Sequence, residues 1–407
     1  MNHRISMLAA AAWLCVGPLA AHAEDGPSWK FSGFGTVDLV HSTERRADYV
    51  ASLAQPNGVG ATTGWSLGID SKLGAQVDAQ FGPQWSASVQ ALTRHQWDDS
   101  YTPELSLGFV KWATSAGVDL RVGRMPYAAF VVSDYRNIGY AQPWVRPPLE
   151  VYSLSLDHVD GMDATWRTSV GDVGLKLQAL AGRTKQELAV GTVTGRRIGG
   201  MNLTADMGAA TARLSMLRIG ELSVSSPAIN GVFGLVRNGV PAGMLFAGSP
   251  AIPPNPAEAD AYEYKNRPST YISLGLGYDP GDWFVSSEYG HVQRVSFGAA
   301  AREFYITGGV RLGAWTPYAN VAQLRHTEKL ASTSPLLQAV IDGSNATDQR
   351  SVSLGLRWDF AKSADVKVQV DRMSNAAGSK GLLIDPRAGF VAGRRYSVLS
   401  VAVDFVF

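Results

Sequence analysis

The final residues of the chain, 396–407, alternate between two kinds of side chain with a period of two. One phase is entirely apolar and holds Leu399, Val401, Val403, Phe405 and Phe407. The other phase is mixed and holds Val398, Ser400, Ala402, Asp404 and Val406. A strand with this pattern has one apolar and one mixed face. Because an open sheet edge this apolar would aggregate, the pattern predicts a closing strand that is paired on both edges and faces lipid on one side.

The same alternation recurs along the chain and predicts sixteen strands. They cover residues 29–40, 65–81, 85–96, 105–114, 118–123, 161–168, 173–184, 198–207, 210–219, 270–279, 283–294, 303–312, 315–325, 350–360, 365–372 and 396–407. The cleanest pattern is at 65–81, where Trp65, Leu67, Ile69 and Val77 share the predicted lipid face. Aromatic residues near both ends of such a face are typical of membrane interfaces.

The connections between these strands alternate between short and long. Short turns are predicted at residues 82–84, 115–117, 169–172, 208–209, 280–282, 313–314 and 361–363. The connections between them cover 43–64, 98–103, 125–160, 185–197, 220–269, 295–302, 326–349 and 373–394. This alternation predicts an all-β fold, a transmembrane up-and-down antiparallel β-barrel with short periplasmic turns and long extracellular loops. A β-sandwich or propeller is the alternative, but neither requires one apolar face on nearly every strand.

Charged residues fall mainly on the inward phase of the predicted strands. A charge on the lipid face near the bilayer centre would cost about 2–4 kcal/mol. Lys111, Arg218 and Arg372 are exceptions on the apolar phase, and their predicted place near strand ends lets them reach lipid headgroups. Sixteen strands enclose an aqueous channel, whereas eight would be filled by side chains.

Residues 1–23 have the features of a secretory signal peptide. Arg4 supplies the positive start, an apolar stretch follows, and Ala21-His22-Ala23 provides the cleavage site. A transmembrane helix is the alternative, but the apolar stretch is short and is interrupted by Gly17 and Pro18. The single cysteine lies inside this segment. We therefore expect residues 24–407 to form a single barrel domain without disulfides.

The overall charge is balanced, with 36 Lys and Arg against 35 Asp and Glu. A nucleic-acid-binding protein would show a basic excess, so nucleic acid is not an expected partner. No H-E-x-x-H or P-loop pattern occurs in the sequence, and no cofactor is implied. Asp157, Asp160 and Asp163 lie close together, but their spacing does not fit an EF-hand calcium loop.

The terminal Phe407 at the end of an apolar strand, together with the sixteen predicted strands, resembles the general porins of Gram-negative bacteria. The resemblance covers residues 24–407 and implies passive diffusion of small hydrophilic solutes and ions through a water-filled channel in the outer membrane. It also implies contact with outer-membrane lipid and lipopolysaccharide, a homotrimer, and recognition by the barrel-assembly machinery through Phe407. No enzymatic activity is expected.

In that family the loop after the fifth strand folds into the barrel and narrows it, and here this loop is residues 125–160. Its aromatic residues Tyr135, Tyr140, Trp144 and Tyr152 suit packing against the inner wall. The expected pore constriction consists of the loop residues Asp134, Arg136, Arg146 and Glu150 and the wall residues Lys72, Arg94, Arg121 and Arg124. Opposed charges across such a passage would create a transverse field. The alternative is that these charges simply pair and attach the loop to the wall.

Two other functions stay open at this point. Residues 220–269 form a long extracellular loop rich in Pro, Ala and Gly, which an adhesin or surface receptor could use for binding. A barrel hydrolase is the other possibility, but His291 and His326 lie at predicted strand ends and nothing marks them as catalytic.

Overall fold

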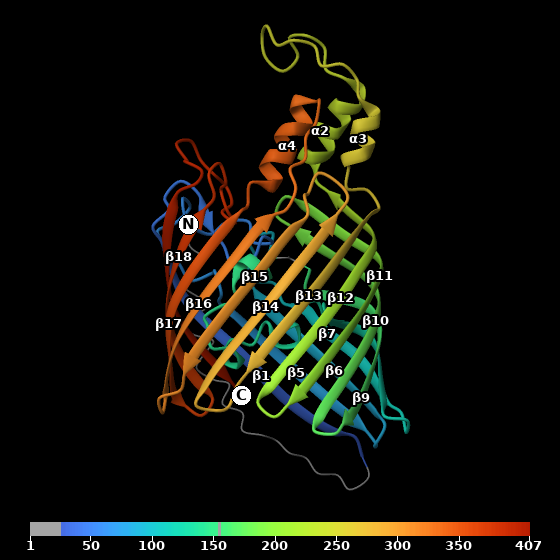
Figure 1. Cartoon of the computed structure of the whole chain (residues 1–407), viewed down its shortest axis with the longest axis vertical. Coiled ribbons are helices and arrows are strands. Elements are labelled where there is room, and N and C mark those ends of the chain that lie inside the picture. The colour runs from blue at the N-terminus through green and yellow to red at the C-terminus, as the bar shows by residue number, and fades with distance from the viewer. Residues whose placement is uncertain (1–25, 154–155) are drawn as a thin grey trace.

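The computed structural model describes residues 26–153 and 156–407, and its main feature is a closed antiparallel barrel of sixteen strands (Figure 1). The strands are β1 (Ser28–Ser42), β4 (Trp65–Ser66) with β5 (Lys72–Phe81), β6 (Trp85–Arg94), β7 (Glu104–Ala113), β8 (Val118–Pro126), β9 (His158–Val170), β10 (Val173–Leu188), β11 (Gly191–Met207), β12 (Ala210–Ser225), β13 (Arg267–Tyr278), β14 (Trp283–Arg294), β15 (Ala301–Val310), β16 (Trp315–His326), β17 (Gln349–Ala361), β18 (Ala364–Asn375) and β19 (Arg395–Val406). A separate two-stranded hairpin consists of β2 (Asp48–Tyr49) and β3 (Val59–Gly60).

The last strand closes the barrel, as its sequence pattern predicts. β19 pairs with β18 on one edge and with β1 on the other, in a register that runs from Phe34↔Val406 to Ser42↔Val398. The backbones of Gly33 and Phe407 exchange two further hydrogen bonds of 2.8 and 3.0 Å. Each strand pairs with its neighbours in the chain, so the up-and-down topology is confirmed.

The strand predicted at residues 65–81 is interrupted. Between β4 and β5 the chain leaves the ladder, and Ile69, which was expected to face lipid, is buried inside at 3% exposure. Asp38 causes this break, because its carboxylate accepts hydrogen bonds from the backbone N–H groups of Asp70 and Ser71 at 3.0 and 2.9 Å. Gln55 donates to the carbonyl of Ile69 at 2.8 Å. Side chains distant in sequence therefore replace the local β pairing.

The long connection predicted at residues 185–197 is also wrong. β10 and β11 continue past the end of β9 and meet at a turn of two residues, 189 and 190. The register runs from Thr184↔Gly195 to Leu188↔Gly191 after a shift at Gly182. Cross-strand pairs such as Lys185↔Thr194 and Gln186↔Val193 hold the segment as a ribbon, although its polar composition suggested a loop.

Lys111 faces the lumen, contrary to its predicted place on the lipid phase. A register shift between Gln90 and Ala91 lies in the ladder of β6 with β7. Past this bulge the exposed residues of β7 are Val110 and Trp112, so Lys111 points inward. A single extra residue reverses which face a side chain occupies.

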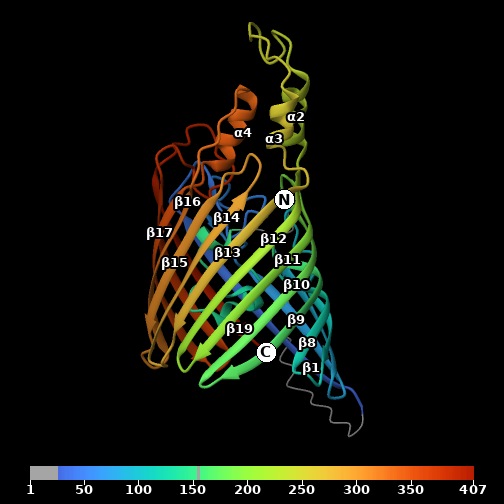
Figure 2. The same ribbon diagram turned by 45° about the vertical axis from the view of Figure 1, so that its right-hand side comes forward.

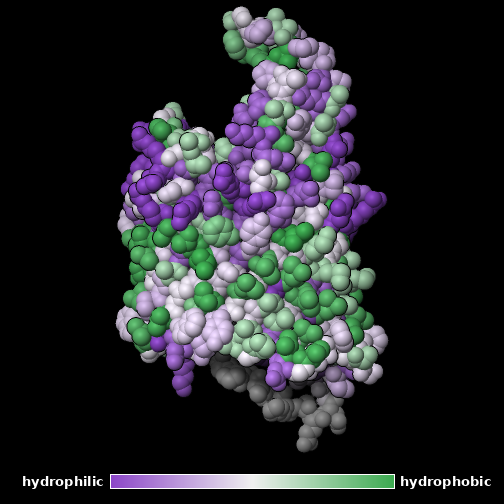
Figure 3. Space-filling model, in the orientation of Figure 1, coloured by the Kyte–Doolittle hydropathy of each residue, from purple (hydrophilic) through white to green (hydrophobic). Residues whose placement is uncertain are grey.

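The outer surface of the barrel is apolar and carries aromatic residues near the short turns. Trp85 stacks on Trp112 with ring centroids 5.7 Å apart, and Trp315 stacks on Trp358 at 5.1 Å. Hydrophobic residues cover much of the wall below a hydrophilic band at the opposite rim (Figure 3). This distribution matches a barrel that crosses hydrocarbon and ends in an interfacial aromatic girdle.

A helical projection stands on the rim of the long loops (Figures 1 and 2). It contains α2 (Pro227–Asn238), α3 (Pro256–Tyr262) and α4 (Pro335–Asn345), so residues 220–269 combine strand extensions with two helices. Phe233, Val236, Leu337 and Ile341 are buried in it. None of the helices in the described residues is long and apolar enough to cross a bilayer. The remaining helical turns, η1 (Ser133–Tyr135), η2 (Gly139–Ala141) and α1 (Leu149–Tyr152), belong to the loop between β8 and β9.

Glycine and an aromatic ring share one cross-strand position in β16 and β17. Gly355 lies opposite Tyr318, and a Cβ added at Gly355 would lie 2.1 Å from the tyrosine ring. The Tyr318 hydroxyl donates to Gln369 Oε1 at 2.8 Å, which prevents the ring from moving aside.

We expect Gly355→Val to reduce the free energy of unfolding by about 1–3 kcal/mol, because the ring and the new side chain compete for one space. Urea unfolding in detergent micelles measures this change. Gly277→Val is the matched control, since a Cβ at Gly277 has no atom within 4 Å. Equal losses in both variants would contradict the packing argument.

Candidate functional site

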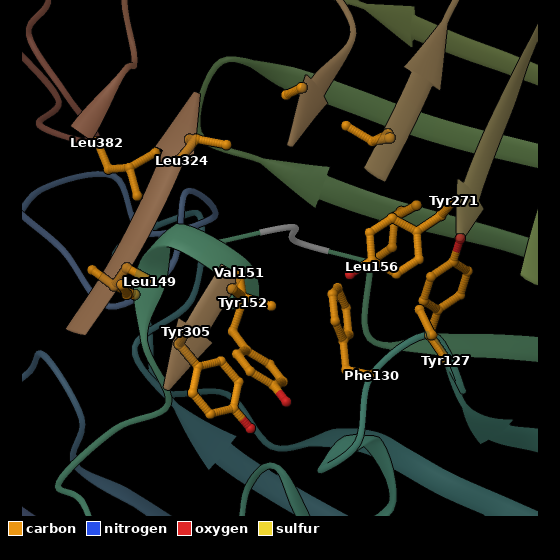
Figure 4. Packing of buried hydrophobic residues seen from close by; sticks show 14 of the residues in the cluster. Tyr127, Phe130, Leu149, Val151, Tyr152, Leu156, Tyr271, Tyr305, Leu324 and Leu382 are labelled. Carbon is orange, nitrogen blue, oxygen red and sulfur yellow. The ribbon is translucent and has the colours of Figure 1, made fainter. Parts of the chain in front are cut away.

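The loop at residues 127–157 folds into the barrel and packs an aromatic cluster against the wall. Phe130, Trp144 and Tyr152 from the loop are buried. The ring of Phe130 lies 4.9 Å from that of Tyr152 and 5.2 Å from that of Tyr271 of β13, and Trp144 meets Tyr305 of β15 edge-on at 5.6 Å. The loop rings and the wall rings lie close together in the lumen (Figure 4). Burial of these rings is the main apolar contribution that holds the loop inside.

Inward-facing cations of the wall bind the loop through its backbone carbonyls. Arg357 of β17 donates to the carbonyls of Tyr140 and Gln142 at 2.8 and 2.9 Å. Lys367 of β18 donates to the carbonyl of Gly139 at 2.7 Å, and Arg213 of β12 donates to that of Ala128 at 3.2 Å. These bonds satisfy both the buried cations and carbonyls that lie outside regular secondary structure.

Arg146 is a deeply buried cation of the loop, with 5% of its side chain exposed. It forms salt bridges with Asp70 at 2.6 Å and with Asp371 of β18 at 3.4 Å. Its Nη2 also donates to Ser400 Oγ of β19 at 2.7 Å. This predicted constriction residue therefore joins the loop to the seam where the barrel closes.

Two buried glutamates complete the attachment. Glu288 of β14 accepts from the Tyr152 hydroxyl at 2.6 Å and from the backbone N–H of Val131 at 3.3 Å. Glu150, in the loop, accepts from the Gln349 side chain of β17 at 2.8 Å. Burial raises the pKa of the Glu150 carboxyl, because its direct partner is an uncharged amide. Glu150 thus lies against the wall of β17, away from Lys72 and Arg94.

The end of the loop is anchored to the wall at β6. Arg94 of β6 forms ion pairs with Asp157 and, at 2.8 Å, with Glu104. Burial raises the pKa of the Asp157 carboxyl, but Arg94 and His158 outweigh burial and hold it well below its usual range. Asp160 pairs with Arg124 and Asp163 with Arg121, so the three neighbouring aspartates bind three different arginines.

Cavities lie on both sides of the loop within the lumen. The larger one, about 740 Å³, opens toward the short turns and is lined by Arg121, Asp134 and Arg136 among others. The smaller one, about 90 Å³, lies toward the long loops and is lined by Lys72 and Arg94. Arg136 and Asn137 line both cavities, so this part of the loop separates them.

The structure therefore brings five of the predicted residues to these cavities: Lys72, Arg94, Arg121, Asp134 and Arg136. Arg146 also borders the smaller cavity, although its charge is paired, and Glu150 attaches the loop to the wall. Arg124 and Asp160 belong to the strand phase of the exposed Val122 and Met162, outside these cavities.

Sequence reasoning missed four cations that line the larger cavity: Lys30, Lys111, Arg167 and Lys176. Lys30, Arg167 and Lys176 lie on the inward phase of the predicted strands, and their position close to the predicted short turns was the available signal. The inward direction of the Lys111 side chain could not be predicted from the sequence, because it depends on the bulge between β6 and β7.

The sequence also contains one G-x-S-x-G match, Gly64-Trp65-Ser66-Leu67-Gly68. A nucleophile elbow needs a strand, a sharp turn and a helix. Here Ser66 lies in the two-residue β4 opposite Val40, with β5 after it. The adjacent His41 pairs with Trp65 on the other face of the sheet, with rings 4.5 Å apart. The motif therefore does not assemble a serine–histidine pair.

No protein-family model matches the chain, and no curated protein matches its sequence. Solved structures with the same fold include the anion-selective porin from Comamonas acidovorans, at 13% identity and a TM-score of 0.56, covering 94% of this chain and 100% of that chain. The outer membrane channel DcaP of Acinetobacter baumannii has 10% identity and a TM-score of 0.55, with coverage of 95% and 99%. OmpF of Salmonella typhi, in complex with daunomycin, has 11% identity and a TM-score of 0.54, with coverage of 94% and 99%. At these identities the similarity establishes the fold.

Arg146→Met is expected to destabilise the protein by about 3–5 kcal/mol, because it leaves Asp70 and Asp371 buried without a cation. Their side chains are each 3% exposed. Urea unfolding measures the loss, and limited proteolysis should show faster cleavage within residues 127–157. Arg387→Met is the control, since its partner Asp385 and Arg387 itself are 60% and 48% exposed. If the two variants unfold at the same urea concentration, Arg146 does not hold the loop.

Proposed function

We propose that this chain is an outer-membrane porin that lets small hydrophilic solutes and ions diffuse passively through its lumen. The observation that carries the proposal is the loop at residues 127–157, which lies inside the barrel yet leaves charged cavities on both of its sides. A loop that served only to fill the barrel would leave no such path. Porins with sixteen strands have aqueous lumens, and a loop inside sets their width.

The narrow part of the path lies where Arg136 and Asn137 separate the two cavities. Asp134 and Arg121 border it on one side, and Lys72 and Arg94 border it on the other. Charges of both signs across a narrow aqueous passage favour polar solutes over apolar ones. In this proposal Arg146 and Glu150 position the loop and Arg124 takes no part.

The similar structures support this assignment. Their titles describe a porin, an outer membrane channel and OmpF, and another neighbour is an outer membrane protein of Vibrio cholerae in trimer form. The apolar wall and aromatic girdle of this chain fit a bilayer with lipopolysaccharide in its outer leaflet. A homotrimer and export by a signal peptide at residues 1–23, which lies outside the described residues, are parts of the same proposal.

A surface-receptor role is the second candidate, because the projection ends in an exposed apolar tip. Met244, Leu245 and Phe246 are 62%, 43% and 66% exposed. Apolar residues grouped at an exposed tip mark a possible contact for another macromolecule. This role and a channel are compatible, since the tip lies far above the rim (Figure 2).

We expect the purified protein to form stepwise, nearly ohmic channels in planar bilayers. Replacing residues 133–150 by a short Gly-Ser linker should raise the single-channel conductance by roughly twofold, because the narrow part of the path is removed.

The matched control removes residues 241–251, which end at the backbone pair of Val240 and Ile252. This deletion shortens the projection by a comparable length and should leave the conductance unchanged. An unchanged conductance after loop replacement would refute the constriction, and the absence of channels in the intact protein would refute the porin.

A further inference from the structure

Cations of like charge lie directly opposite each other at three positions of one wall. The pairs are Lys72↔Arg94 across β5 and β6, Lys111↔Arg121 across β7 and β8, and Arg167↔Lys176 across β9 and β10. Like charges in directly opposite positions destabilise a sheet. Like charges also meet at Arg357↔Lys367 and Asp365↔Asp404, but there the wall and the loop supply partners of opposite sign or carbonyl groups. What distinguishes β5 to β10 is that three such pairs consist of cations alone on neighbouring strands, and departures of this kind concentrate at functional sites.

The arginine of each pair has a carboxylate partner, but the lysine does not. Arg94 pairs with Asp157 and Glu104, Arg121 with Asp163, and Arg167 with Asp119. Within the described residues, no salt bridge or hydrogen bond of a side chain reaches Lys72, Lys111 or Lys176, and all three line the cavities. Asp70 and Asp404 lie near enough to Lys72 to act on its charge without forming a salt bridge with it. The three ammonium groups thus keep hydrogen-bonding capacity for water or for a solute.

The charges that line the cavities are predominantly positive. The larger cavity has the cations Lys30, Lys111, Arg121, Arg136, Arg167 and Lys176 and the carboxylates Asp78, Asp119, Asp134 and Asp157. The smaller cavity has the cations Lys72, Arg94, Arg136 and Arg146 and one carboxylate, Asp70. Because the whole chain is nearly neutral, this excess is a property of the path and not of the composition.

The positive wall faces the part of the lumen that the loop leaves open. The loop covers the strands β12 to β19, where Arg213, Arg357 and Lys367 are bound to its carbonyls. The lysines of β5, β7 and β10 have no such cover. A narrow aqueous space between low-dielectric walls strengthens the field of unpaired charges and concentrates ions of opposite sign.

We propose that Lys72, Lys111 and Lys176 form a row of anion sites that makes the channel selective for small oxyanions, namely carboxylates and phosphate. The row runs from the smaller cavity past Arg136 to the short-turn end of the larger cavity. Ammonium groups on flexible stems bind an oxyanion as point charges and release it readily, which suits transfer between successive sites. This inference rests on the proposed function, since it requires an open channel.

The test is the reversal potential of the current across planar bilayers in a gradient of potassium chloride. The intact protein should be more permeable to chloride than to potassium. In the triple variant Lys72→Gln, Lys111→Gln and Lys176→Gln, the ratio of anion to cation permeability should fall about threefold or more, because three positive charges leave the path.

Two controls separate charge from folding and from net charge. The triple variant Lys72→Arg, Lys111→Arg and Lys176→Arg keeps the charges and should keep the selectivity. Lys329→Gln removes a positive charge from an exposed loop position and should behave like the intact protein. An unchanged permeability ratio in the glutamine triple variant, or a preference of the intact channel for potassium, would overturn the anion row while leaving the porin intact. No conductance in the intact protein would refute the proposed function itself.

Inorganic phosphate and acetate then test the solute class. Each anion, added to the chloride solution at constant ionic strength, should reduce the chloride current of the intact protein in a saturable way and do so less in the glutamine triple variant. Reduction by phosphate alone or acetate alone would narrow the class to that anion. Equal reduction in both proteins would show that the lysines do not bind oxyanions.

Discussion

The inward-facing cations of β12, β17 and β18 need acceptors, and the backbone of one loop supplies them. An apolar outer surface cannot solvate Arg213, Arg357 or Lys367, so their partners must lie inside the barrel. Lys367 is fully buried; its ammonium group donates to the carbonyl of Gly139 and forms a salt bridge with Asp404. Carboxylates of the wall, Asp359, Asp365 and Asp404, pair with Arg357 and Lys367, and the loop carbonyls add further acceptors. These bonds favour the position of the loop, because a loop that left the lumen would lose them.

The attachment is one-sided, and the rest of the lumen depends on that asymmetry. Tyr152, Arg146 and Glu150 all bind the half of the wall that includes β14, β17 and β18. On the other half, Arg146 also pairs with Asp70 just before β5, and Asp157, at the end of the loop, pairs with Arg94. The loop therefore fills one side of the barrel and leaves cavities along the other. Several charges on that second side, Lys111 and Lys176 among them, border the larger cavity.

The sequence predicts what depends on local periodicity and misses what depends on distant contacts. The alternation of apolar and polar residues identifies the strands and the closing role of residues 396–407, because every second residue of such a strand faces hydrocarbon. Ile69 obeys the same alternation, yet Asp38 and Gln55 pull its segment out of the ladder. The side chain of Lys111 points into the lumen because of a β-bulge, and no residue type in the sequence predicts that bulge. In the same way the aromatic residues of the loop predict burial, but the partners of Arg146 and Glu150 lie more than seventy positions away.

Structures whose sequences are 10–13% identical to this chain share its fold. This is possible because the fold requires only that successive strand residues alternate between apolar and polar. The lipid-facing phase accepts most apolar residues, and the lumen-facing phase accepts most polar ones. The alternation does not determine whether an inward charge is positive or negative. Substitutions can therefore change the charge of the lumen wall without weakening the closure of the barrel. The opposed cations of β5 to β10 show this freedom. They repel each other across the ladder, and the barrel tolerates them because the backbone hydrogen bonds of a closed sheet do not depend on which side chains face the water. Selectivity in such a barrel must therefore be derived from individual lumen residues and not from the fold that carries them.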